Sequence, residues 1–227
     1  MKTFLTNDEI KRMIEAAPCL RDKVFMAFYF DTGCRVSELL SVKVENIDLD
    51  QGTVLIPHLK RGIRKYCPGC GRAAGRRSAF CAKCGYNLSD IIPQGTELRS
   101  RLISIGEETI ALLHDWIKGM RPDEPLIKLS RQQINNIVRE LAASIGLKGK
   151  VMLNPETGKK HYVHPHNLRD SLAVDWLTLR GDVEGQKALQ QHLGHRSFET
   201  TARYYKLTPQ ATRRIGDEVR RARLGTK

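Results

Sequence analysis

The chain has 227 residues, of which 41% are hydrophobic, so it is long enough to bury the core of one large domain or two small ones. Lysine and arginine total 38 against 25 acidic residues, and the net charge of +13 favours a polyanionic partner such as nucleic acid. The N-terminus has no apolar signal-peptide core, and no stretch approaches the ~18 uncharged residues of a membrane span. We therefore expect a cytoplasmic protein without a membrane partner.

The first part of the chain predicts three helices. Thr6 and Glu9 form the pattern of a capping box, which predicts a helix that ends before Pro18. A second helix is expected over 20–31 and a third over 36–42, with Gly33 as the break between them.

Short strands are expected over 53–56 and 101–105, because both runs are rich in residues that favour strands. Together they indicate a β-hairpin interrupted by the segment between them. Further helices are expected over 107–119, 130–145, 167–179, 184–193 and 199–205, the second of them opened by a Ser130/Gln133 capping box. The predicted fold class is mainly α with a small antiparallel β-sheet.

Four cysteines lie in the segment that interrupts the hairpin. Cys67 and Cys70 form one CxxCG knuckle, and Cys81 and Cys84 form a second, a spacing that allows four thiolates to converge on one Zn²⁺. In a reducing compartment metal binding is favoured over disulfides. A site with four protein sulfurs has no open position, so we expect a structural zinc in an inserted module over 61–95.

The other cysteines and the charges near the knuckles have less specific interpretations. Cys19 and Cys34 fall in or beside predicted helices and are expected to be packed thiols. Basic residues around the knuckles suit either DNA phosphate contact or an ordinary charged surface; they are Arg64, Arg72, Arg76, Arg77 and Lys83.

Three separated segments carry residues suited to phosphate chemistry. They are TGCRVSEL at 32–39, HNLR at 166–169, and LGH at 193–195 followed by Tyr204. Each alone has an ordinary explanation as a surface arginine, an i,i+3 surface pair or a core tyrosine. Their joint order, from about Leu5 to Tyr205, resembles the catalytic domain of tyrosine recombinases, the family of phage integrases.

The resemblance implies catalytic roles for six residues of this chain. Arg35 and Arg169 would be the arginines that balance the charge of the phosphate, and His166 would accept a proton. His195 would donate a hydrogen bond to the phosphate. Tyr204 would be the nucleophile, with Tyr205 as the alternative, and Lys60 would be the general acid, with Lys65 as the alternative.

By the same resemblance, the protein would be a DNA strand-transferase that forms a covalent 3′-phosphotyrosine without metal or ATP in the chemistry. It would act on double-stranded DNA as a tetramer, and the basic tail at 206–227 could be exchanged between neighbours or be a solvated end. The sequence departs from the family pattern at Asp170 and Lys206, two positions where histidine is common.

Two other functions remain open at this point. A type IB topoisomerase or resolvase would use the same set of catalytic groups to relax or resolve DNA. A non-catalytic zinc-containing protein would bind DNA phosphates without cutting them. Replacing Tyr204 with phenylalanine distinguishes the DNA-binding protein from an enzyme, because only an enzyme would lose covalent attachment to DNA.

Overall fold

The computed structural model describes residues 2–57, 64–75, 77–92, 100–154, 157–195 and 197–204, together with 216, 217, 220 and 221. The chain divides into two compact units, one of Met1–Ile56 and Arg101–Lys227 and the other of Pro57–Ser100. The expected fold class is confirmed, because the chain is mainly helical and its paired strands form small sheets. No helix in the described ranges is both long and apolar enough to cross a membrane.

The first unit begins with two helices whose ends follow from local sequence. Helix α1 spans Asn7–Glu15, and the predicted capping box is present, since Thr6 accepts from the Glu9 backbone and Glu9 accepts from that of Thr6. Helix α2 spans Leu20–Thr32 and ends at Gly33, whose φ of 52° is left-handed. Helix α2 packs against α1, α4 and α6 and is the central helix of this unit.

Helix α3, Val36–Leu39, is three residues shorter than the expected helix over 36–42. After Leu40 the backbone tightens into a turn in which Val42 N–H donates to Leu39 O at 3.0 Å. Val42 O in turn accepts from Leu126 N–H at 2.9 Å, so a contact with a distant segment ends the helix. The 3₁₀ helix η1, Val44–Asn46, follows.

The sheet of the first unit has three strands in the order β1-β2-β5. The central strand β2, Thr53–Pro57, pairs antiparallel with β1, Ile47–Asp48, which the sequence pattern did not predict. Strand β5, Ser100–Ser104, is the other neighbour of β2. The two strands of the expected interrupted hairpin are therefore adjacent.

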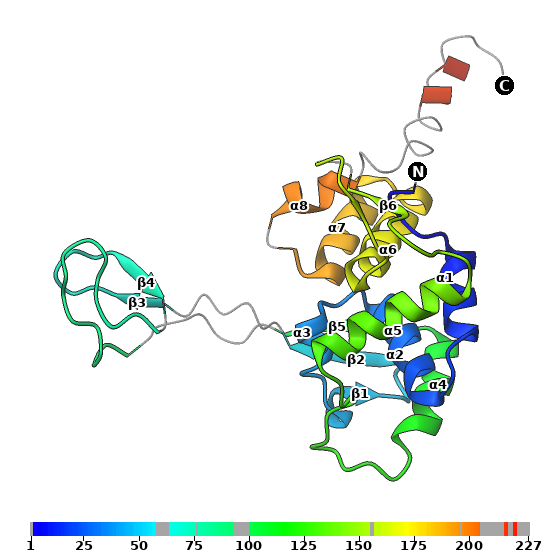
Figure 1. The fold of residues 1–227 in the computed structure, drawn as a ribbon, viewed down its shortest axis with the longest axis horizontal. Coiled ribbons are helices and arrows are strands. Elements are labelled where there is room, and N and C mark those ends of the chain that lie inside the picture. The colour runs from blue at the N-terminus through cyan, green and yellow to red at the C-terminus, as the bar shows by residue number, and fades with distance from the viewer. Residues whose placement is uncertain are drawn as a thin grey trace. The chain divides into compact units, whose positions relative to one another are not determined.

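The remaining helices of the first unit lie close to their expected ranges. Helix α4 ends two residues early because Gly119 takes a left-handed φ of 81°, and α5 has the predicted Ser130/Gln133 capping box. Figure 1 shows α6, α7 and α8 grouped at one end of this unit, away from β1 and α4. The helices are α4 (Glu107–Ile117), α5 (Arg131–Ser144), α6 (Pro165–Leu179), α7 (Val183–Leu193) and α8 (Phe198–Ala202), and a two-stranded sheet pairs β6 (Met152–Leu153) with β7 (Lys160–His161).

Two apolar clusters fill the first unit. The larger one includes Phe25 and Phe28 of α2, Leu113 of α4 and Val138 of α5, all fully buried. The smaller one joins α6 to α7 through residues such as Leu177 and Leu193, and it also contains Tyr204. The tyrosine is thus positioned by packing between two helices.

The second unit has a very small apolar core. Its strands β3 (Arg64–Tyr66) and β4 (Ala73–Gly75) form an antiparallel pair. Its buried cluster consists of Cys67, Cys81 and Leu88, so one large aliphatic side chain is fully buried within the described part of this unit. Such a cluster is too small to hold a fold by hydrophobic burial alone.

Candidate functional site

The loop that follows α2 places Arg35 at the start of α3. A side chain at Gly33 would put its Cβ 2.7 Å from methyl groups of Leu172 and Leu193, so only glycine fits between α6 and α7 with this backbone. Arg35 is the N-cap of α3 and bonds twice to Glu38: its backbone N–H donates to Oε2 at 3.0 Å, and its Nη1 donates to Oε1 at 2.9 Å. The direction of the Arg35 guanidinium is therefore fixed by Glu38.

Glu38 also binds Arg101, a residue of β5 that the sequence analysis did not single out. Arg101 Nη2 lies 3.0 Å from Glu38 Oε2, and Arg101 Nε donates to His192 O at 2.8 Å. Glu38 is 1% exposed. Burial alone would raise the pKa of Glu38, but the hydrogen bond and charge of Arg101, with those of Arg35, lower it to about 2. Glu38 is consequently a carboxylate at neutral pH.

Arg169 joins three segments that are distant in the sequence. It lies on α6, is 1% exposed, and donates through Nη1 to Gly33 O and through Nη2 to Leu193 O at 2.8 Å. The same Nη2 lies 2.9 Å from His195 Nε2. Burial and the nearby charge of Arg35 lower the pKa of Arg169. The two arginines predicted to bind phosphate thus lie close enough to interact.

His195 lies in the loop between α7 and α8 and has a defined tautomer. Because an arginine only donates, His195 Nε2 accepts from Arg169, and its Nδ1 donates to Thr201 Oγ1 at 2.9 Å. Burial, followed by the charges of Arg169 and Arg35, lowers the pKa of His195 to about 3. The ring is therefore neutral at pH 7, and the hydrogen bond expected from His195 to a phosphate stays a prediction.

Tyr204 follows α8 and contacts both His195 and Asp170. Its ring stacks on that of His195 with the centroids 6.1 Å apart, and its Oη donates to Asp170 Oδ1 at 3.0 Å. His166 Nε2 lies 3.6 Å from the same carboxylate oxygen. Burial and the charge of Asp170 raise the pKa of Tyr204. Asp170, noted above only as a departure from the family pattern, is thus the direct partner of the phenol.

The structure brings together five of the six residues predicted to be catalytic: Arg35, His166, Arg169, His195 and Tyr204. Lys60, the favoured general acid, lies outside the described residues, as do Tyr205 and Lys206. Lys65, the alternative to Lys60, belongs to the second unit, where its buried Nζ donates to Ser78 O at 3.3 Å and Leu88 O at 2.5 Å. Those bonds give Lys65 a structural role in that unit.

The four cysteines of the second unit form a compact cluster. Their sulfur atoms all lie within 4.8 Å of one another, with Cys67 Sγ 3.4 Å from Cys84 Sγ and Cys70 Sγ 3.6 Å from Cys81 Sγ. Four sulfurs at about 2.3 Å from a tetrahedral Zn²⁺ would lie about 3.8 Å apart, so the cluster fits this ion. Of the two cysteines outside the cluster, Cys34 is buried as expected, whereas Cys19 is exposed at the N-cap of α2, so the expectation of a packed thiol is wrong for Cys19.

The backbone of each knuckle is built in the same way. Gly71 and Gly85 take left-handed φ angles of 69° and 71°, and their N–H groups donate to Cys67 O and Cys81 O. The backbone N–H groups of Lys83 and Cys84 lower the pKa of Cys81, which favours a thiolate there. For Cys84, the backbone N–H of Tyr86 acts in the same direction, but the neighbouring sulfurs of Cys67 and Cys70 outweigh it and raise the pKa. Of the basic residues near the knuckles, Arg64, Arg72, Arg77 and Lys83 are exposed, and Arg76 lies outside the described residues.

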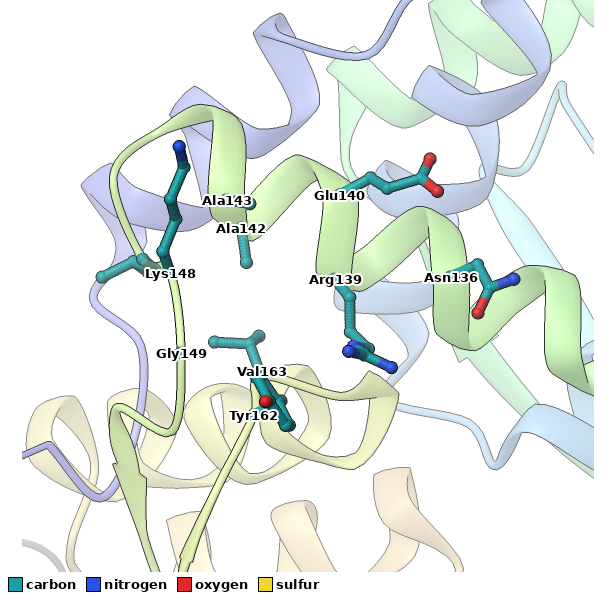
Figure 2. A pocket seen from close by; sticks show the side chains of 10 residues that line it. Asn136, Arg139, Glu140, Ala142, Ala143, Lys148, Gly149, Tyr162 and Val163 are labelled. Carbon is teal, nitrogen blue, oxygen red and sulfur yellow. The ribbon is translucent and has the colours of Figure 1, made fainter.

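A separate hollow of about 420 Å³ lies between α5 and the segment that follows β7. Figure 2 shows Arg139 of α5 directed toward Tyr162, and its guanidinium carbon lies 4.5 Å from the centre of that ring. The ten lining residues include none of those predicted to be catalytic: Asn136, Arg139, Glu140, Ala142, Ala143, Leu147, Lys148, Gly149, Tyr162 and Val163. The hollow is therefore distinct from the cluster around Arg169.

Known proteins with similar sequences belong to the family that the motifs around Arg169 resemble. Residues 3–73 and 86–211 match the model of the phage integrase family. Tyrosine recombinase XerA of Pyrococcus furiosus is 27% identical over 224 residues, which cover 97% of this chain and 62% of that protein. The type 1 fimbriae regulatory protein FimE of Escherichia coli is 24% identical over 212 residues, covering 89% of this chain and 85% of that protein.

Solved structures show the same fold. A crystal structure of XerA recombinase has a TM-score of 0.65 at 23% identity and covers 97% of this chain and 66% of that one. The Tn1549 transposon integrase in complex with transposon right end DNA has a TM-score of 0.59 at 15% identity, covering 96% of this chain and 66% of that one. The chain spans less than two thirds of the length of the XerA proteins from Pyrococcus. The resemblance drawn from the sequence motifs is confirmed.

Proposed function

Because the chain belongs to the phage integrase family, we propose that it is a site-specific DNA recombinase that cleaves and rejoins DNA through a covalent 3′-phosphotyrosine. The observation that carries the proposal is the contact of Tyr204 and Arg169 with the same His195, next to Arg35. A nucleophile and two guanidiniums at one place are what transfer of a phosphodiester to tyrosine requires. Relatives named tyrosine recombinases support the same activity.

The chemistry follows from the residue types at the site. Arg35 and Arg169 balance the negative charge on the non-bridging oxygens of the pentacoordinate phosphorus, since guanidiniums offer fixed forks of donors. Tyr204 Oη attacks the phosphorus and forms the covalent bond to the 3′-phosphate. Lys60 protonates the leaving 5′-oxygen. The phosphotyrosine conserves the bond energy, so another 5′-hydroxyl can rejoin the strand without ATP.

The partner of this reaction is double-stranded DNA, bound by four copies of the protein. The net charge of +13 favours a polyanion, and Tn1549 integrase, a structural neighbour, is described in complex with DNA. In this scheme the basic tail at 206–227 is the segment exchanged between neighbouring copies, and the protein acts in the cytoplasm.

The second unit binds one structural Zn²⁺ through Cys67, Cys70, Cys81 and Cys84. The sulfur distances support this assignment, and so does the small apolar core of the unit, which needs a further source of stability. All four ligands come from the protein, so the ion holds the module together and takes no part in strand transfer.

The test is formation of a covalent adduct with a nicked suicide DNA substrate, in a buffer without Mg²⁺ or ATP. The wild-type, zinc-loaded protein is expected to give an adduct that survives a denaturing gel, and Tyr204→Phe is expected to give none while binding DNA as tightly as the wild type. Tyr205→Phe is the matched control, because it removes the neighbouring hydroxyl. Binding without any wild-type adduct would favour a non-catalytic DNA-binding protein, and loss of the adduct with Tyr205→Phe alone would move the nucleophile to Tyr205.

A further inference from the structure

Asp170 differs in chemistry from the histidine that is common at its position in the family. An ionised carboxylate only accepts hydrogen bonds, whereas a histidine can also donate. Asp170 lies on α6 directly after Arg169, and its side chain is 19% exposed. Its Oδ1 accepts the hydrogen bond of Tyr204 Oη at 3.0 Å, so among the described residues it is the carboxylate in contact with the reacting oxygen.

On the basis of the proposed function, we propose that Asp170 is a catalytic residue, the general base that removes the proton of Tyr204 as the phenol attacks DNA. The distance of 3.0 Å from Tyr204 Oη to Asp170 Oδ1 lies within the range of about 2.6–3.2 Å over which a base takes a proton directly. His166, which the family resemblance suggests as the proton acceptor, approaches the same carboxylate oxygen at 3.6 Å. His166 therefore contacts Asp170 and not the tyrosine oxygen, so the proton acceptor and the histidine beside it are different residues.

The burial of Asp170 suits a general base. The groups that face it are His161 of β7, His166 and Arg169 of α6, and Tyr204 after α8. Burial raises the pKa of Asp170, although the charges of His166 and Arg169 act in the opposite direction. A carboxylate with a raised pKa accepts a proton more readily than an exposed one.

The same charge explains why proton transfer and attack belong together. While Asp170 is ionised, its charge raises the pKa of Tyr204 and opposes formation of a phenolate. Once the proton has moved from Tyr204 Oη to Asp170 Oδ1, the carboxyl is neutral and the repulsion is gone. The bond from Oη to phosphorus then forms, the bond from phosphorus to the 5′-oxygen breaks, and that oxygen takes a proton from the general acid.

His166 lies beside Asp170 and is open to solvent. Its side chain is 60% exposed, and its Nε2 lies 3.6 Å from Asp170 Oδ1. After cleavage, the proton on Asp170 can return to Tyr204 when a 5′-hydroxyl attacks the phosphotyrosine, as reversal of the reaction requires. In this arrangement His166 is a positioning residue for Asp170.

The experiment measures single-turnover cleavage of the suicide substrate as a function of pH by the zinc-loaded, full chain. Asp170→Asn keeps the shape of the side chain and is expected to slow adduct formation about 100-fold or more, with DNA binding and dependence on Tyr204 unchanged. Asp175→Asn is the matched control, since it removes the same charge from α6 at a position beside Phe4 and Leu5. Asp170→Glu, which keeps a carboxylate, is expected to cleave faster than Asp170→Asn.

A fluorinated tyrosine at position 204 separates a base from a residue that only positions the phenol. Its lower phenol pKa reduces the need for a base, so it is expected to recover much of the rate lost in Asp170→Asn and to have little effect in the wild type.

A wild-type protein without any adduct would refute the proposed function, whereas a wild-type adduct formed equally fast by Asp170→Asn would refute only the role of Asp170. Faster cleavage by Asp170→Asn, or a loss that the fluorinated tyrosine does not recover, would also overturn it. If Asp170→Asn does not fold, equal rates of adduct formation by Asp170→Glu and Asp170→Ser would refute the role of Asp170.

Discussion

Replacing Glu38 with glutamine keeps the size of the side chain and removes the charge that Arg35 and Arg101 share. The pKa of Glu38 falls from 4.5 to about 2 in the folded chain, and at about 1.4 kcal/mol for each tenfold change this corresponds to about 3 kcal/mol of stability. Removing one partner of a buried ion pair typically costs about 3–5 kcal/mol, which agrees. We therefore expect Glu38→Gln to lower the free energy of unfolding by about 3 kcal/mol at pH 7.

The pH dependence of this loss distinguishes the charge from other effects of the substitution. Because the folded-state pKa of Glu38 is depressed, its contribution is full above about pH 4.5 and is lost as the pH falls toward 2. The difference between the wild type and Glu38→Gln is expected to shrink to about 2 kcal/mol at pH 3.5.

The assay is urea unfolding of the two proteins at both pH values, followed by circular dichroism. Glu45→Gln is the control, because Glu45 forms an exposed pair with Lys43 at 3.0 Å and is expected to change stability by less than about 1 kcal/mol. A loss of less than about 1 kcal/mol for Glu38→Gln at pH 7, or a loss that does not shrink in acid, would refute the reasoning.

Two further predictions concern the zinc module and the packing of α7. The purified chain is expected to contain one zinc ion. Cys70→Ser is expected to lose the ion and the amide NMR shift dispersion of the unit Pro57–Ser100, while the other unit keeps its spectrum. An unchanged metal content in Cys70→Ser, or the same loss in the exposed control Cys19→Ser, would contradict this. Gly185→Ala is expected to destabilise the protein by about 1–3 kcal/mol, because a Cβ at this position would lie 2.1 Å from Arg180 O. The control Lys187→Ala changes an exposed residue of the same helix and is expected to leave the midpoint of urea unfolding nearly unchanged. Equal midpoints for both variants would contradict the prediction.

Local sequence predicted the helix starts better than the helix ends. The capping boxes at Thr6 and Ser130 depend on residues three positions apart, so the sequence contains all that is needed. The end of α3 depends on the hydrogen bond from Leu126 to Val42, and β1 depends on pairing with β2. Contacts between distant segments are not visible in a local pattern.

The same distinction applies to the candidate site. The motifs named Arg35, Arg169, His195 and Tyr204 because their order resembles that of a known family. The contact of Arg101 with Glu38 joins residues 63 positions apart, and that of Tyr204 with Asp170 joins residues 34 positions apart. Nothing in either local sequence indicates its partner, so the roles of Arg101 and Asp170 required the fold.

Arg169 holds the loops on either side of it through main-chain oxygens, those of Gly33 and Leu193. Every amino acid carries such an oxygen, so these two hydrogen bonds depend on the path of the backbone and not on a particular side chain, although at Gly33 only glycine allows that path. The guanidinium, by contrast, has no substitute among the other side chains that could reach both oxygens with one rigid fork. Side-chain changes in the loops that leave the backbone path unchanged are therefore compatible with both contacts, whereas a change of Arg169 removes both at once.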